Sequence, residues 1–309
     1  MTRQVESRTT PARILLATDL GARCDRALDR AVELARAWGA ELFAVHALRA
    51  DLLLEDPSAP PQPCSVPPSL QASLHGSWPR EPDALAVATD ALQRDLEGTP
   101  FPILPLVVPG EPAPVILAAA EEHRCDLIVI AVAKDEALGG FLLGATVDKV
   151  LRQAKVPVLV VRQRPRHPYG GIVVAADVSP ASRAALRRTV ALFPGTPFHV
   201  FHAYDPPLGG LLTDAAEYRQ AFGELAQRDL EAFLAEAEIG PGHVIDVLVE
   251  RGDPARLIQH YVRSCRADLV VLGTEGRGPL LELLVGSTAK SVLDGLACDA
   301  LVVPVAADA

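Results

Sequence analysis

Short apolar runs alternate with longer amphipathic segments along most of this chain. In the first half, the runs that predict strands are 14–18, 42–48, 105–108, 126–132 and 157–162. Apolar residues recur at helical spacing in segments 22–39, 112–123 and 145–154. Strands that alternate with helices predict right-handed crossovers and a parallel sheet covered by helices on both faces.

The same order of elements returns in the second half. Val107 to Val161 realigns without a gap on Val249 to Val303, and Asp19 and His46 correspond to Asp177 and His202. A repeat of this length is a duplicated domain, and a copy of about 150 residues can bury its own core. The predicted domains are residues 11–163 and 170–306. The Pro-containing segment 162–170 is interpreted as the linker, and the Pro- and Ser-rich segment 52–82 as an insertion in a surface loop.

Composition narrows the class of protein. Apolar residues make up 49% of the chain and aromatic residues only 5%, which is typical of buried parallel strands between amphipathic helices. A net charge of −10 opposes binding to nucleic acid or anionic lipid. No membrane span or signal peptide is evident, so we expect a cytoplasmic protein. The five cysteines form no C-x-x-C pair and are interpreted as reduced thiols, most of them buried.

The two copies differ where the fourth strand leads into the last helix. At four corresponding positions the second copy carries Gly273, Gly276, Gly286 and Ser287. The first copy carries Ala131, Lys134, Gly144 and Ala145 there. Glycine lets backbone N–H groups converge on an anion, and a helix N-terminus favours one. A phosphate-binding pattern is therefore intact in the second copy and eroded in the first.

Several motifs occur in the same order in both copies. Each copy has an aspartate after its first strand, a V-x-x-G-x-P-A segment before its second helix, a D-L-[IV]-V-[IL] strand and an apolar closing strand. The second copy adds G-x-x-G-x9-G-S. In these motifs the chain resembles the universal stress protein family. The resemblance implies five-stranded sheets of order 3-2-1-4-5. It also implies that the two closing edge strands pair, so that the copies form an intramolecular pseudo-dimer.

The resemblance further implies an ATP site in the second copy. Strands one and four are neighbours whose connections leave in opposite directions, and such a switch point opens a crevice at their carboxyl ends. Asp177 is expected near the adenosine, with ATP bound with or without Mg²⁺. The expected phosphate-binding residues are Gly273, Gly276, Arg277, Gly286, Ser287 and Thr288.

Most of these residues also have a structural explanation. Ser287 is a good helix N-cap, and Gly273 suits the turn that leaves a strand. Because Asp19 persists where the glycines do not, we expect it to cap the following turn and not to bind a ligand. His46 and His202 have no nucleophile motif beside them and are expected to be structural. Metal-ligand spacing and a Walker lysine are both absent from the sequence.

Three functions remain open. The first is an ATP-binding regulatory or stress-protective module without efficient turnover. The second is a nucleotide-free structural or interaction protein of the same fold, and the third is a slow ATPase. The sequence identifies no protein partner and leaves self-association open.

Overall fold

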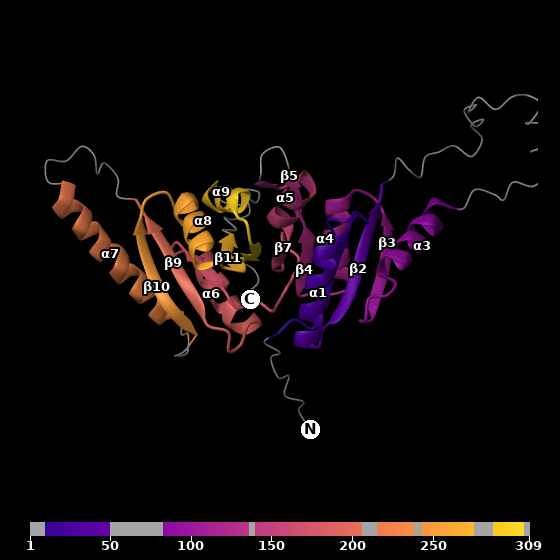
Figure 1. Cartoon of the computed structure of the whole chain (residues 1–309), viewed down its shortest axis with the longest axis horizontal. Coiled ribbons are helices and arrows are strands. Elements are labelled where there is room, and N and C mark those ends of the chain that lie inside the picture. Colours follow the sequence, from indigo (N-terminus) through magenta and orange to yellow (C-terminus); the bar gives the residue numbers. More distant parts are fainter. Residues whose placement is uncertain are drawn as a thin grey trace, which may run out of the picture.

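A computed structural model describes residues 10–49, 83–135, 140–205, 215–237, 239, 243–274 and 287–305. Their main feature is one ten-stranded sheet of order β10-β9-β8-β11-β12-β7-β4-β1-β2-β3. Each half of this order is a 3-2-1-4-5 sheet, so the predicted strand order is confirmed in both copies. Figure 1 shows the copies side by side, with β7 and β11 near the middle and α3 and α7 at opposite ends.

The first copy carries the five predicted strands and two short extra ones. Its strands are β1 (Arg13–Thr18), β2 (Glu41–Leu48), β3 (Ile103–Pro109), β4 (Leu127–Ala131), β5 (Ala133–Asp135), β6 (Gly140–Leu142) and β7 (Val158–Val161). Its helices are α1 (Asp25–Trp38), α3 (Ala84–Leu96), α4 (Pro112–Glu122) and α5 (Ala145–Gln153). Gly39 ends α1 in the left-handed conformation, with φ of 64°, as its position after the helical segment predicts.

The second copy has the same five main strands. They are β8 (Ile172–Ala176), β9 (Phe198–Tyr204), β10 (Val244–Arg251), β11 (Leu269–Thr274) and β12 (Asp299–Pro304). The helices are α6 (Pro180–Leu192), α7 (Ala215–Glu236), α8 (Pro254–Cys265) and α9 (Ser287–Gly295). Gly195 follows the corresponding helical segment of the second copy, a position that also predicts a C-cap, but α6 ends earlier, with Phe193 as its C-cap. Gly195 instead lies in the following turn with φ of 76°.

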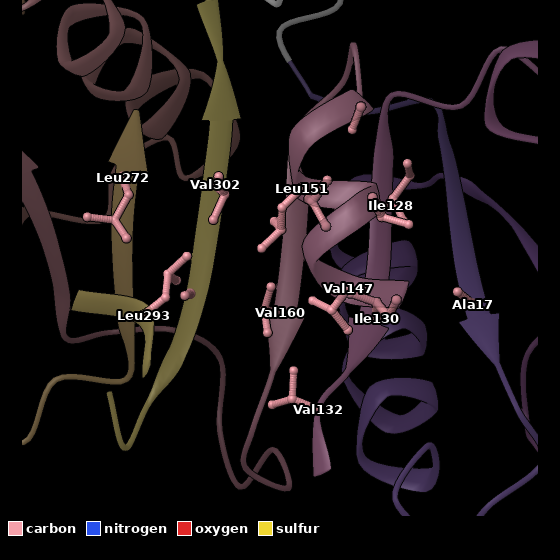
Figure 2. Packing of buried hydrophobic residues seen from close by; sticks show 14 of the residues in the cluster. Ala17, Ile128, Ile130, Val132, Val147, Leu151, Val160, Leu272, Leu293 and Val302 are labelled. Atoms are coloured by element: carbon pink, nitrogen blue, oxygen red, sulfur yellow. The ribbon is translucent and has the colours of Figure 1, made fainter. Parts of the chain in front are cut away.

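Two apolar clusters cover the two faces of the sheet. Helices α4, α5, α8 and α9 pack on one face, and α1, α3, α6 and α7 pack on the other. Each cluster draws residues from both copies. Figure 2 shows part of the first cluster, with Val160 and Leu151 of the first copy near Val302 and Leu293 of the second. The two copies therefore share a continuous hydrophobic core and are not independent domains joined only by a linker.

The closing strands join the copies. β7 and β12 pair antiparallel, with Leu159 opposite Leu301, and every residue of the paired segments is buried. Burying these two apolar edges satisfies backbone groups that would otherwise face solvent. The predicted pairing of the closing edges is confirmed.

A buried polar cluster reinforces this junction. Asp299 is 1% exposed, and its Oδ1 accepts the backbone N–H groups of Arg162 (2.7 Å) and Gln163 (3.0 Å). Its Oδ2 accepts the Tyr169 hydroxyl at 2.6 Å and lies 3.6 Å from Nε of Arg30. The Arg30 guanidinium also stacks on the Tyr169 ring, 3.8 Å from its centroid. Arg162 and Tyr169 of the segment interpreted as a linker are thus part of the junction.

The outer edges of the sheet are built differently from the inner ones. The Gly110 N–H donates to the Leu48 carbonyl, so alternate N–H groups of β3 face β2. Pro105 and Pro109 occupy positions whose N–H groups would face outward, and proline has none. On β10, the Asp246 carboxylate accepts the neighbouring Val247 N–H at 2.9 Å. The outer strands therefore expose fewer backbone N–H donors than edge strands without these features would.

Candidate functional site

The expected crevice of the second copy lies at the carboxyl ends of β8 and β11. These strands are neighbours in the sheet, and α6, α8 and α9 approach their ends. A cavity of about 170 Å³ lies here, and Asp177, Gly273 and Thr288 line it together with apolar residues of α8 and α9. Ser287 is the first residue of α9. The structure thus brings together the described part of the expected set, whereas Gly276, Arg277 and Gly286 lie outside the described residues.

Asp177 shapes the turn that leaves β8. Its Oδ1 accepts the Ser179 N–H at 3.1 Å, and the residue itself is exposed. Ser179 then caps α6 by accepting the Ser182 N–H at 3.2 Å. Asp177 therefore combines this turn contact with a place in the lining of the cavity.

Gly273 is held in place by packing. A Cβ atom built on this residue would overlap the Ala181 carbonyl and lie 2.7 Å from the Ser182 nitrogen. Both contacts are with the backbone of the first turn of α6, which cannot rotate away as a side chain could. Gly273 is therefore required for α6 to lie against β11, whether or not a ligand is bound.

The corresponding crevice of the first copy is larger. It encloses about 470 Å³ at the ends of β1, β2 and β4 and at the starts of α1, α4 and α5. Ala131 lines this cavity at the position of Gly273, and Ala145 lines it at the position of Ser287. The erosion of the glycine pattern therefore did not close the crevice.

A charged cluster occupies one wall of this larger crevice. The Arg23 guanidinium pairs with Asp19 Oδ2, while Asp19 Oδ1 accepts the Gly21 N–H and the Cys24 thiol at 3.1 Å each. Burial raises the pKa of Asp19, but hydrogen bonds from Arg23, Cys24 and Gly21 outweigh it and hold the pKa below its ordinary value. Burial, followed by the nearby Asp19 carboxylate, raises the pKa of Cys24 to about 11. Asp19 caps its turn, as expected.

Sequence reasoning missed Arg23 and Cys24 as residues of the crevice. The signal was present in the repeat, since Ala181 and Ser182 stand at these positions in the second copy. Of the two, Arg23 differs from the second copy by a charge and Cys24 by a thiol in place of a hydroxyl.

Two short strands follow the fourth strand of the first copy. β5 and β6 pair antiparallel, with Lys134 opposite Phe141. Part of the backbone that would have to converge on a phosphate chain is therefore used in a hairpin. The corresponding residues 275–286 of the second copy lie outside the described residues.

The two repeated histidines have the same role in both copies. Nδ1 of His46 donates to the Thr18 carbonyl at 3.1 Å, and Nδ1 of His202 donates to the Ala176 carbonyl at 2.8 Å. Each ring thereby ties the end of the second strand to the end of the first. These are structural imidazoles, as expected.

Comparison with known proteins identifies the class. The sequence profile of the universal stress protein family matches residues 11–162 and 168–304. The chain belongs to the universal stress protein family. A universal stress protein of Mycobacterium tuberculosis H37Rv is 29% identical over 227 residues, which cover 68% of this chain and 70% of that protein. Universal stress protein E of Salmonella typhi is 26% identical over 207 residues, covering 63% and 65%.

Solved structures agree on the fold. A Pseudomonas aeruginosa PAO1 protein described as functionally unknown superposes with a TM-score of 0.63 at 19% identity, covering 97% of this chain and 96% of that one. A universal stress protein from Archaeoglobus fulgidus gives a TM-score of 0.58 at 18% identity, covering 95% and 98%. Within the described ranges, no helix combines the length and apolar character needed to cross a bilayer.

Proposed function

We propose that this chain is a nucleotide-responsive regulatory or protective module that binds one ATP, with or without Mg²⁺, in its second copy. The observation that supports this proposal most is the crevice where Asp177, Gly273 and the N-terminus of α9 meet. Backbone N–H groups at a helix start favour an anion, and the switch point of an open α/β sheet is where such folds bind ligands.

The described walls account for part of such a site. They enclose about 170 Å³, whereas ligand cavities usually span about 300–1,000 Å³. Gly276, Arg277 and Gly286 belong to residues 275–286, which follow β11 in the sequence, precede α9 and lie outside the described residues. The ATP proposal therefore relies on the sequence of this segment for most of the phosphate contacts.

Calorimetry on the purified chain tests the proposal. We expect about one ATP per chain. Gly276→Lys, which copies the first domain's residue into the second, should weaken the affinity for ATP at least tenfold, or by about 1.4 kcal/mol. Lys134→Gly should leave the stoichiometry near one, because Ala131 and Ala145 still differ from the second copy. Two equivalent sites, or unchanged affinity in Gly276→Lys, would rule the assignment out.

The other two functions have their own readouts. A chain that binds no ATP, and releases none when denatured and examined by mass spectrometry, would favour the nucleotide-free interaction protein. A phosphate-release assay under single-turnover conditions tests for a slow ATPase. We expect little or no hydrolysis, because phosphoryl transfer needs a positioned nucleophile as well as an anion site. Rapid multiple turnovers that Gly276→Lys abolishes would overturn this expectation.

A further inference from the structure

The crevice of the first copy is a ligand-sized cavity without a role in the ATP proposal. Its volume of about 470 Å³ lies within the usual range for small-molecule sites. Its floor is apolar, formed by side chains at the ends of the strands and the starts of α4 and α5. These residues include Val45, Ile116, Ile130, Val132 and Val147. Such a floor favours a ligand with an apolar body.

The charges around this cavity favour an anion. Among the described lining residues, the cations Arg23 and Arg49 outnumber the one carboxylate, Asp19, which pairs with Arg23. The formal charge of these residues is therefore positive in a chain of net charge −10. The Cys24 thiol adds no charge at neutral pH because its pKa is raised to about 11. The positive end of α5 also faces the cavity, since Gly144, Ala145 and Thr146 line it and no side chain caps this helix.

The backbone of the loop after β4 limits how much negative charge a ligand of this cavity can carry. A triphosphate needs several converging N–H groups, but the loop after β4 uses part of its backbone in the β5–β6 hairpin. The Asp19 carboxylate already accepts hydrogen bonds from Arg23, Cys24 and Gly21, and these contacts hold it at the wall of the cavity. What remains is an apolar cavity with one anion-binding end.

We propose that the first-copy crevice binds a small molecule with an apolar body and a single anionic group, and that it does not bind a nucleoside triphosphate. This site is separate from the ATP site and does not depend on it. Each copy would then have its own ligand chemistry within one continuous sheet.

Fluorescence titration with 8-anilinonaphthalene-1-sulfonate tests this proposal, because the probe combines an aromatic body with one sulfonate. We expect saturable binding of about one probe per chain that excess ATP does not displace. Thr146→Asp places a carboxylate at the start of α5 and should weaken binding of the probe at least tenfold. An acidic residue in the first turn also suits a helix, so the variant should remain folded, as thermal unfolding will show.

Two further variants sharpen the assignment. Arg23→Gln removes one cation and should weaken the probe severalfold while leaving ATP binding unchanged. Thr288→Asp is the matched change in the second copy, at the position that corresponds to Thr146, and should leave probe affinity within twofold of the wild type. Loss of ATP binding in Thr288→Asp with an intact probe site would show the two sites to be independent.

Three results would overturn the proposal. The first is a wild-type chain that binds no probe. The second is a folded Thr146→Asp variant with unchanged probe affinity. The third is displacement of the probe by ATP or its loss in Thr288→Asp, which would place the probe in the second copy. If ATP fails to bind the wild type while the probe still responds to Thr146→Asp, the ATP proposal fails and this one stands.

Discussion

The crevices of the two copies differ in where the first helix begins. In the second copy, α6 begins at Pro180, directly after its cap Ser179. Pro180 corresponds to Ala22 of the first copy, where α1 begins only at Asp25. The extra turn of α6 lies over the end of β11 and fills the space of a Gly273 side chain. The two crevices therefore differ in the start of the first helix as well as in the glycine motif.

The largest expected effect of a difference between the copies is on stability, at the junction where β7 pairs with β12. Asp299 of the second copy corresponds to Pro157 of the first. Asp299→Ala leaves the buried Tyr169 hydroxyl and two backbone N–H groups without their acceptor. It also removes one of the two carboxylates beside the buried Arg30, which keeps its pair with Glu33. Removing one partner of a buried ion pair costs about 3–5 kcal/mol. Urea unfolding should show a loss of this size.

The matched variant Pro157→Ala serves as the control and should lose much less, because it removes no polar partner. If the cluster also couples the copies, Asp299→Ala should broaden unfolding or split it into two transitions. A loss below about 1 kcal/mol in Asp299→Ala would show that the cluster does not hold the junction.

A smaller effect on stability is expected at Gly273, near the end of β11. Gly273→Ala forces the first turn of α6 to move, and overpacking of this kind costs about 1–3 kcal/mol. Ala131→Gly, the reverse change in the first copy, should cost only about 0.5–1 kcal/mol, from chain entropy. Thermal unfolding without added nucleotide measures both. Equal stability of Gly273→Ala and the wild type would mean that α6 does not lie as close to β11 as described.

The smallest effect concerns the thiol of the larger crevice. With a pKa of about 11, only about one Cys24 in a thousand is a thiolate at pH 8. Cys265 of the second copy is exposed, so iodoacetamide should label it far sooner. The Cys24 rate should rise as the pH approaches 11. Peptide mass spectrometry measures both sites, and equal rates at pH 8 would contradict a neutral, sheltered Cys24.

The sequence alone predicted the elements that follow from local pattern. Apolar runs and helical spacing were sufficient for the main strands and helices. The strand order and the pairing of β7 with β12 came from the resemblance to the universal stress protein family. Local pattern could not predict the contacts that join distant residues. Asp299 meets Tyr169 across 130 positions of the chain, and no periodicity encodes that distance.

The same limit applies to the crevices. The glycine pattern predicted which residues of the second copy would meet, and Asp177, Gly273 and Thr288 do line one cavity. It did not predict that Gly273 would be required by α6, since that depends on where a helix begins. Nor did it predict the β5–β6 hairpin, whose short strands follow β4 after a single residue.

The prolines of β3 have a consequence for the protein at high concentration. β3 is an edge strand with exposed apolar side chains, among them Leu104 at 52% and Val108 at 38%. An apolar edge of this kind is a template for adding strands from other molecules, which is how ordered aggregates grow. Pro105 and Pro109 remove every second outward donor from that template. The ten-stranded sheet therefore offers a poorer template for further strands at its β3 edge.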